Sequence, residues 1–279
     1  MGKVRKIPTV LIVLLVGGIL VGLNISSVCS TKTITGGLPP KNGDWIINNP
    51  TVVKDETLII NGSILIQDGG SLEIINSTLY MNLSSDGEHR IEVYGGGKLV
   101  IINSTITAYN TSNNYYIIID YNATLNISGS NISYAGYDHA VYSGLYISTE
   151  NVTIENSIFY NNYYGIYLNG ANNSLIQWNQ FLNSRYRAIH IEDSTNISLI
   201  KNTIDNSTYG INIYNSNNIT IKHNTVTNIE RNGIEVYGIT KSAIEHNTIE
   251  NNGLSGIVLY TDSNNNSITY NDIENNSVI

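Results

Sequence analysis

A cation, an imidazole and two carboxylates are spaced along the second half of the chain so that they could act together. They are Arg187, His190, Glu192 and Glu235. A base and a cation are the groups that a polysaccharide lyase or epimerase needs beside a sugar carboxylate. The same set, with its aromatic neighbours, also suits the non-catalytic binding of an acidic or neutral glycan.

Three tyrosines form a second candidate site, because Tyr214, Tyr237 and Tyr260 recur every 23 residues. Sugar rings pack on exposed aromatic faces, so a strip of tyrosines predicts a glycan-binding surface. Tyrosines stacked on a sheet also stabilise it by packing on one another. The sequence leaves both interpretations open.

Two histidines, His223 and His246, have the same spacing of 23 residues. Imidazoles about 5 Å apart on adjacent strands could share a metal ion. Their column continues as Trp178, Lys201 and Tyr270, which supply no third ligand. We therefore predict a solvated pair and no cofactor.

A repeat of 22–24 residues sets these spacings. It is marked by asparagines, each followed two places on by an apolar residue: Asn156, Asn179, Asn202, Asn224, Asn247 and Asn271. About nine residues after each of the first five comes a small residue that opens a short apolar strand, as in Gly210-Ile-Asn-Ile. Such self-similarity predicts a stacked repeat fold. We expect each asparagine to take a left-handed corner and to bond to the asparagines of adjacent coils.

Apolar residues alternate within each repeat, as Ile211 and Ile213 do, which is typical of a strand with one buried face. Each repeat contains about three such strands, separated by Asn, Ser and Gly turns. We predict an all-β fold, a single parallel β-helix of roughly nine coils over residues 51–279. Residues 31–50 are predicted to form a linker and an N-terminal cap.

The repeat also predicts which side chains share the outward face of one sheet. One column contains Tyr146, Tyr167, His190, Asn212, Glu235 and Val258, and the next contains Ser148, Asn169, Glu192, Tyr214, Tyr237 and Tyr260. His190 and Glu235 are two coils apart, about 10 Å, which is too far for a direct acid–base pair. This spacing favours binding over catalysis.

Composition excludes several classes of function. The 279 residues have a formal charge of −8 and only 13% charged residues, with no basic footprint for nucleic acid. The single cysteine, Cys29, excludes an intrachain disulfide framework and Cys-rich zinc sites. The Ile-, Tyr- and Asn-rich composition is typical of an archaeal protein.

The N-terminus has the order of a secretory signal. Lys3, Arg5 and Lys6 precede an uncharged run from Ile7 to Leu23, and small polar residues follow it. Residues 1–30 are predicted to be a cleaved signal peptide or, uncleaved, a helical membrane anchor. The many Asn-x-Ser/Thr sequons are potential glycan acceptors in an exported chain, although an Asn-rich composition also produces them by chance.

The pattern Asn-x-Ile, Gly-Ile-x-Leu, Asn-x-Ile over about residues 60–279 resembles the right-handed parallel β-helix repeats of the NosD-like and pectate-lyase-like superfamily. The resemblance implies a carbohydrate-related protein of the cell surface, and its NosD side implies an association with copper. The Asp pairs and Gly-His-Gly of polygalacturonase-like enzymes and the Asp-Pro-His-Asp of alginate epimerases are absent.

We therefore predict an exported, secreted or cell-surface protein with a non-catalytic role in glycan binding or cell-envelope structure. A polysaccharide-active enzyme and a copper-associated protein are the alternatives. The expected partner is a polysaccharide or cell-envelope glycan, with the membrane as a further partner if the N-terminal segment is uncleaved. The last repeat stops in mid-coil, which leaves end-to-end self-association open.

Overall fold

The computed structural model describes residues 12–16, 19–23, 32–139 and 141–277, and the chain divides into the units Met1–Lys32 and Thr33–Ile279. The described part of the first unit is an antiparallel pair, β1 (Ile12–Val16) and β2 (Ile19–Leu23). A helix was expected here. The segment is rich in β-branched Ile and Val, which favour strands. The described residues include no helix that could cross a membrane. Most of the predicted signal or anchor segment lies outside them.

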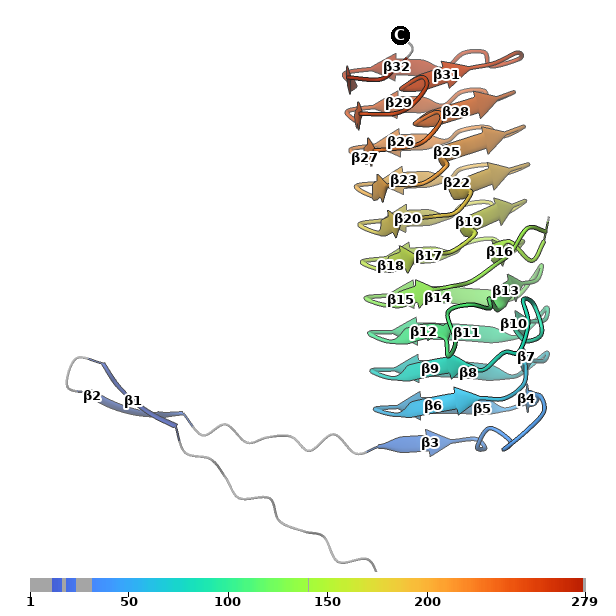
Figure 1. Cartoon of the computed structure of the whole chain (residues 1–279), viewed down its shortest axis with the longest axis vertical. Coiled ribbons are helices and arrows are strands. Elements are labelled where there is room, and N and C mark those ends of the chain that lie inside the picture. Colours follow the sequence, from blue (N-terminus) through green and yellow to red (C-terminus); the bar gives the residue numbers. More distant parts are fainter. Residues whose placement is uncertain (1–11, 17–18, 24–31, 140, 278–279) are drawn as a thin grey trace, which may run out of the picture. The chain divides into compact units, whose positions relative to one another are not determined.

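The second unit consists of three sheets that run along a solenoid (Figure 1). The first sheet contains β4 (Trp45–Ile47), β7 (Ile64–Ile66), β10 (Arg90–Val93), β13 (Tyr116–Ile119), β16 (Gly144–Ile147), β19 (Tyr164–Asn169), β22 (Arg187–Glu192), β25 (Tyr209–Tyr214), β28 (Ile234–Tyr237) and β31 (Ile257–Leu259). The second sheet contains β3 (Thr33–Thr35), β5 (Pro50–Lys54), β8 (Ser71–Ile75), β11 (Lys98–Ile102), β14 (Thr124–Ser128), β17 (Thr153–Glu155), β20 (Leu175–Gln177), β23 (Ser198–Ile200), β26 (Thr220–Lys222), β29 (Ala243–Glu245) and β32 (Ser267–Thr269). The third sheet contains β6 (Thr57–Ile60), β9 (Thr78–Met81), β12 (Thr105–Ala108), β15 (Asn131–Ser133), β18 (Ile158–Tyr160), β21 (Gln180–Leu182), β24 (Thr203–Asp205), β27 (Thr225–Thr227), β30 (Thr248–Glu250) and β33 (Asp272–Glu274).

From β4 to β33, each strand pairs in parallel with the strand three places further along the chain, so one coil adds one strand to each sheet. This arrangement confirms the predicted all-β parallel β-helix. It has about ten coils where nine were expected, because residues 45–60 form a complete coil before the recognisable repeat begins. β3 pairs antiparallel with β5, so residues 33–50, predicted as linker and cap, contain two strands and the start of a third.

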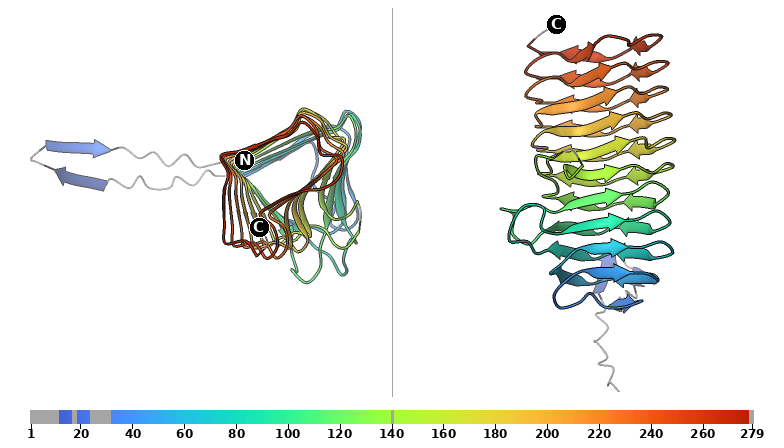
Figure 2. Two further views of the ribbon diagram at one scale, coloured as in Figure 1. Left: turned by 90° about the horizontal axis from the view of Figure 1, so that it is seen from above. Right: turned by 90° about the vertical axis from the view of Figure 1, so that its right-hand side faces the viewer.

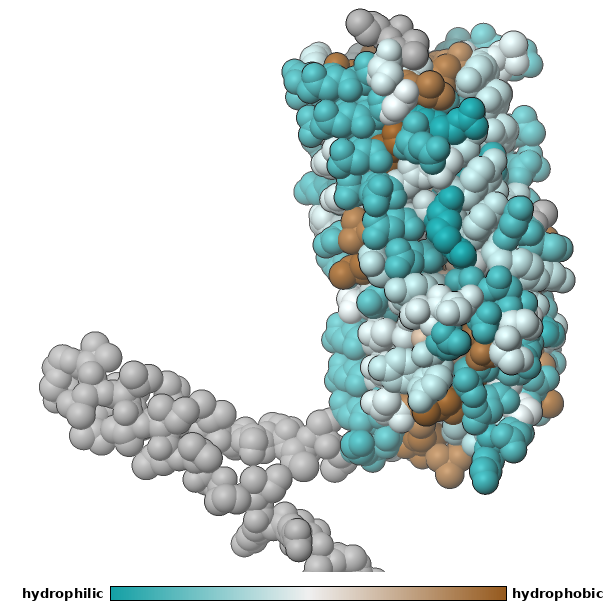
Figure 3. All heavy atoms as spheres, viewed as in Figure 1, coloured by the Kyte–Doolittle hydropathy of each residue, from teal (hydrophilic) through white to brown (hydrophobic). Residues whose placement is uncertain are grey.

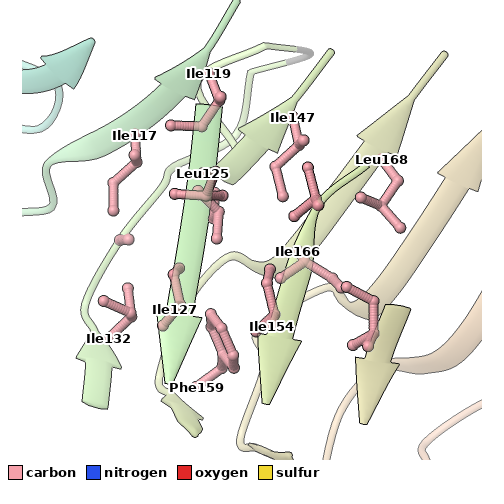
Figure 4. Packing of buried hydrophobic residues seen from close by; sticks show 14 of the residues in the cluster. Ile117, Ile119, Leu125, Ile127, Ile132, Ile147, Ile154, Phe159, Ile166 and Leu168 are labelled. Carbon is pink, nitrogen blue, oxygen red and sulfur yellow. The ribbon is translucent and has the colours of Figure 1, made fainter. Parts of the chain in front are cut away.

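The core lies between the three sheets, which surround it when the solenoid is viewed along its axis (Figure 2). Alternate strand residues point inward and stack on an apolar residue of the next coil, as Ile119 does on Ile147 and Ile127 on Ile154 (Figure 4). Apolar burial of this kind contributes roughly 25 cal/mol per Å². The face of the solenoid shown in Figure 3 is mostly hydrophilic, with hydrophobic residues gathered near the first coils.

The asparagine ladder differs from the prediction in where its members lie. Asn179, Asn202, Asn224 and Asn247 are buried, and the left-handed residue of each corner is the one before, as in His223 (φ 57°). Each ladder Nδ2 donates to the Oδ1 of the next coil, at 2.9–3.1 Å. An amide inside the corner can satisfy buried backbone groups, whereas the left-handed position outside it accepts other residue types.

Asn156 was assigned to the wrong column. It is exposed and left-handed (φ 52°), and Ser157 takes the ladder position, donating its backbone N–H to Asn179 Oδ1 at 2.9 Å. Phe159 is consequently the buried residue of β18, while Ile158 faces solvent. The slip of one residue arises because earlier coils use serine in the ladder, so the asparagine beside it falls at the corner.

Candidate functional site

The outward face of the first sheet has both predicted columns. Tyr167, His190, Asn212 and Glu235 are register partners on β19, β22, β25 and β28. The next column follows the same register: Asn169, Glu192, Tyr214 and Tyr237. The repeat places these side chains at successive strands of one face because side-chain direction alternates along a strand.

Three of the four residues singled out for chemistry, Arg187, His190 and Glu192, line one hollow of about 290 Å³. All three are on β22. The other residues that line the hollow are Tyr164 and Tyr167 of β19 and Tyr214 of β25. We call it the Arg187 hollow.

The Arg187 guanidinium lies among aromatic rings. Its Cζ is 4.9–5.8 Å from the ring centroids of four tyrosines: Tyr164, Tyr186, Tyr209 and Tyr214. Its Nη1 donates to the Tyr164 hydroxyl at 3.0 Å and lies 3.4 Å from His190 Nε2. Cation–π contacts hold such a group in place by electrostatic attraction to the ring faces.

His190 is almost completely buried, with 4% of its surface exposed. Burial, and then the charge of Arg187, lowers the pKa of His190 to about 3. The ring is therefore neutral near pH 7, and its Nε2 is the acceptor because a guanidinium only donates. A base with this pKa takes up a proton poorly at neutral pH.

Glu192 borders the hollow and is held by an aromatic hydroxyl. The Tyr167 hydroxyl donates to Glu192 Oε2, and Asn169 Nδ2 donates to that hydroxyl at 3.3 Å. Glu192 Oε2 is 3.8 Å from His190 Nε2. Burial, and then Glu192, raises the pKa of Tyr167. Cation, imidazole and carboxylate thus meet on one strand.

Glu235 does not join them. It is buried on β28, with Asn212 of β25 between it and His190 in the register. Asn232 Nδ2 donates to Glu235 Oε2 at 2.7 Å. The carboxylate of Glu235 is therefore hydrogen-bonded within its own coil and does not reach the hollow.

The tyrosine strip is a stack of parallel rings. The centroids of Tyr214 and Tyr237 are 4.6 Å apart with 12° between their planes, and those of Tyr237 and Tyr260 are 4.1 Å apart with 5°. Both faces of Tyr237 are thus covered by its neighbours. A sugar has access to ring edges along the strip.

His223 and His246 lie on adjacent coils, as predicted. Their ring centroids are 5.2 Å apart, and His246 stacks in turn on Tyr270 at 5.0 Å. Within the described ranges, no group of three or more His, Cys, Asp or Glu residues could hold a metal ion.

A longer connection between β15 and β16 contacts residues that neighbour the hollow. Asp138 Oδ1 accepts the Tyr163 hydroxyl at 3.0 Å, and Gly136 O accepts from Arg185 Nη2 at 2.6 Å. Tyr163 stacks in turn on Tyr164 of the hollow at 5.6 Å.

Sequence reasoning missed the ring of tyrosines around Arg187 and the burial of Asn212. Tyr164 and Tyr209 share the register column of Arg187, and Tyr186 comes directly before Arg187, so the spacing of these residues was a usable signal. Asn212 was placed in the correct column, but its complete burial depends on the size and direction of its neighbours.

The fold can now be compared with known proteins. Residues 143–278 match the family model of the right-handed β-helix region. This chain is a right-handed parallel β-helix protein. No curated protein sequence matches it.

Solved structures share the β-helix. The periplasmic alginate epimerase AlgG is similar with a TM-score of 0.68 and 17% identity, over 80% of this chain and 64% of AlgG. The Dettilon tailspike protein is similar with a TM-score of 0.51 and 15% identity, over 82% of this chain and 55% of the tailspike chain. This β-helix protein therefore spans less than two thirds of either chain, and identities this low indicate a common fold alone.

Proposed function

We propose that this β-helix protein binds a polysaccharide without chemical conversion, at the Arg187 hollow and the adjacent stack of Tyr214, Tyr237 and Tyr260. The observation that carries the proposal is a group of buried polar atoms without hydrogen-bond partners, next to the tyrosines that surround Arg187. Arg187 Nε, His190 Nδ1 and both amide atoms of Asn212 are buried without a partner. Buried polar atoms are normally paired, so unpaired ones beside an aromatic hollow favour a ligand that supplies the partners.

The protonation of the site favours binding over catalysis. His190 is a weak base because burial and Arg187 depress its pKa, and Glu235 lies outside the hollow. Arg187 is surrounded by rings, which restricts its access to a substrate carboxylate. These features suit a rigid recognition surface.

The 3.8 Å approach of His190 Nε2 to Glu192 Oε2 favours one alternative, a polysaccharide-active enzyme that uses Arg187, His190 and Glu192. In that function the carboxylate would hold the imidazole while the imidazole moved a proton. The depressed pKa of His190 opposes this role.

The proposed function includes a location outside the cytoplasm. The order of the N-terminal residues is that of a secretory signal or anchor, and AlgG, which shares the fold, is periplasmic. We place this protein in the cell envelope or outside the cell, with a glycan as partner.

A glycan array with the purified protein tests the proposal, followed by product analysis of every bound glycan. We expect binding with unchanged glycan chains, and loss of binding in Arg187→Ala. Lys222→Ala is a matched control because Lys222 is a cation of the second sheet, paired with Glu245 at 3.1 Å. Equal binding by Arg187→Ala would contradict the proposed site, and shortened, unsaturated or epimerised products would establish the enzyme.

A further inference from the structure

We infer that Asn212 is a specificity-determining residue that selects a neutral sugar unit, one that presents a hydrogen-bond donor and an acceptor side by side. A vicinal hydroxyl pair and an acetamido group share this chemistry. The inference rests on the proposed function and names the class of sugar.

Asn212 is in an unusual position for an amide. It has 0% exposure, and neither Nδ2 nor Oδ1 has a partner. Among the described residues, eight buried side-chain atoms lack a partner, and four belong to Arg187, His190 and Asn212. The buried asparagines of the corner ladder, in contrast, have amide and carbonyl partners, for example Asn224. The unpaired atoms are therefore concentrated on this face.

Asn212 lies beneath the edge of the Arg187 hollow. Its register partner His190 and its neighbour on the same strand face, Tyr214, both line the hollow. Arg187 Cζ is 5.8 Å from the Tyr209 ring and 5.6 Å from the Tyr214 ring, and these residues flank Asn212 on β25. The guanidinium thus lies against the stretch of β25 that carries Asn212. For a ligand to reach the amide, the side chain of Arg187 or Tyr214 must rotate aside while the paired strands beneath stay in place.

The charges around Asn212 disfavour an anionic sugar. Glu235 is its register partner on one side, and Glu192 borders the hollow on the other. His190 is neutral, so Arg187 is the one cation among these groups, and four rings surround it. A carboxylate here would be the third negative charge beside a single cation, whereas a neutral group meets no such repulsion.

The amide itself specifies the ligand chemistry. Its Nδ2 donates and its Oδ1 accepts, so a bidentate partner must offer an acceptor and a donor in one plane. An unpaired buried amide destabilises the folded state, and an apolar side chain of similar size at this position would avoid that cost. Sites that bind through buried polar groups discriminate strongly against ligands that leave those groups unpaired.

Substitution of Asn212 by Val and by Thr tests the inference, since the two side chains have nearly the same shape and differ by one hydroxyl. The probes are soluble oligosaccharides of three kinds: neutral hexoses, N-acetylhexosamines and uronates. We expect the unsubstituted protein to prefer one of the neutral kinds over uronates. Asn212→Val should raise Tm and weaken that binding at least about tenfold, and Asn212→Thr should retain more affinity than Asn212→Val.

Asn126→Val is the matched control, because Asn126 is exposed on β14 of the second sheet and its loss should change neither binding nor Tm appreciably. A preference for uronates, or unchanged affinity in Asn212→Val, overturns the inference and leaves the proposed glycan binding intact. A protein that binds no oligosaccharide, with Tm raised in Asn212→Val, overturns both, and the amide is then only a buried hydration site.

Discussion

At the scale of single residues, the environment decides what each candidate group can do. Tyr237 has an aromatic ring, but its two faces are covered, and His190 has an imidazole, but burial keeps it neutral. Residue type alone would assign a sugar platform to the first and a proton acceptor to the second. Because of their neighbours, Tyr237 contributes stacking and His190 contributes hydrogen bonding.

Tyr237→Ala should lower the free energy of unfolding by about 1–3 kcal/mol, because it removes two stacked pairs in addition to buried ring area. Chemical denaturation measures this loss. Tyr270→Ala is the control, since that ring is 79% exposed and its loss should have little effect. Unchanged stability together with lost glycan binding would show instead that the face of Tyr237 is open to a ligand.

His190 makes stability depend on pH in a defined window. Its folded-state pKa, about 3, is below the ordinary value of 6.5, so the unfolded chain binds more protons between these pH values. The contribution of His190 to the free energy of unfolding is fully present above pH 6.5 and is lost as pH falls toward 3. The free energy of unfolding is lower by about 3 kcal/mol at pH 4. We expect His190→Asn to flatten the decline of Tm between pH 7 and pH 4. The control His223→Asn, at an exposed corner, should keep the full decline.

At the scale of the elements, each coil corner combines three positions with different requirements. A left-handed residue comes first, a buried ladder residue second and the first strand residue third, as in Asn103-Ser104-Thr105. This order reads Asn-x-Ser/Thr wherever the corner is Asn and the strand begins with Ser or Thr. Coil geometry thus accounts for many of the sequons without any requirement for glycosylation.

Asn224→Ala should destabilise the protein by about 2–4 kcal/mol. It removes the Nδ2 bonds to Leu199 O and Asn247 Oδ1, and it leaves the Asn202 backbone N–H without its acceptor. Asn224→Ser should cost less, because Ser77, Ser104, Ser130 and Ser157 fill the same ladder in earlier coils. Equal unfolding curves for both variants would show that the ladder contributes little.

At the scale of the whole molecule, contacts run almost entirely between adjacent coils, so stability should be a sum of coil and interface contributions. The three sheets share one core, which transmits a defect to neighbouring coils first. This arrangement also gives the outward face its rigidity, since each strand of the Arg187 hollow is paired on both sides.

Phe181→Ala should reveal this nearest-neighbour behaviour. Phe181 is fully buried and stacks on Phe159 of the preceding coil at 4.9 Å, so we expect a loss of about 3–5 kcal/mol. Hydrogen exchange should accelerate most in β18, β21 and β24 and least in β4–β6. A uniform acceleration along the solenoid would indicate that it unfolds as one cooperative unit.

The spacing of residues along the chain was enough to predict the three-strand coil, the register and the columns of outward side chains. A period near 23 with alternating apolar residues predicts stacked coils of three strands, because each coil must bury its inner face against the next. The same pattern could not separate Asn156 from Ser157 at the corner, since both residue types suit a tight turn.

The properties of the candidate site, in contrast, follow from tertiary packing. The enclosure of Arg187 by four tyrosines, the neutral state of His190 and the unpaired amide of Asn212 depend on how side chains of three adjacent coils fill space. Burial and electrostatic environment arise from that packing, which has no signature in the spacing of residues along the chain. The columns were therefore predictable, and their chemistry was not.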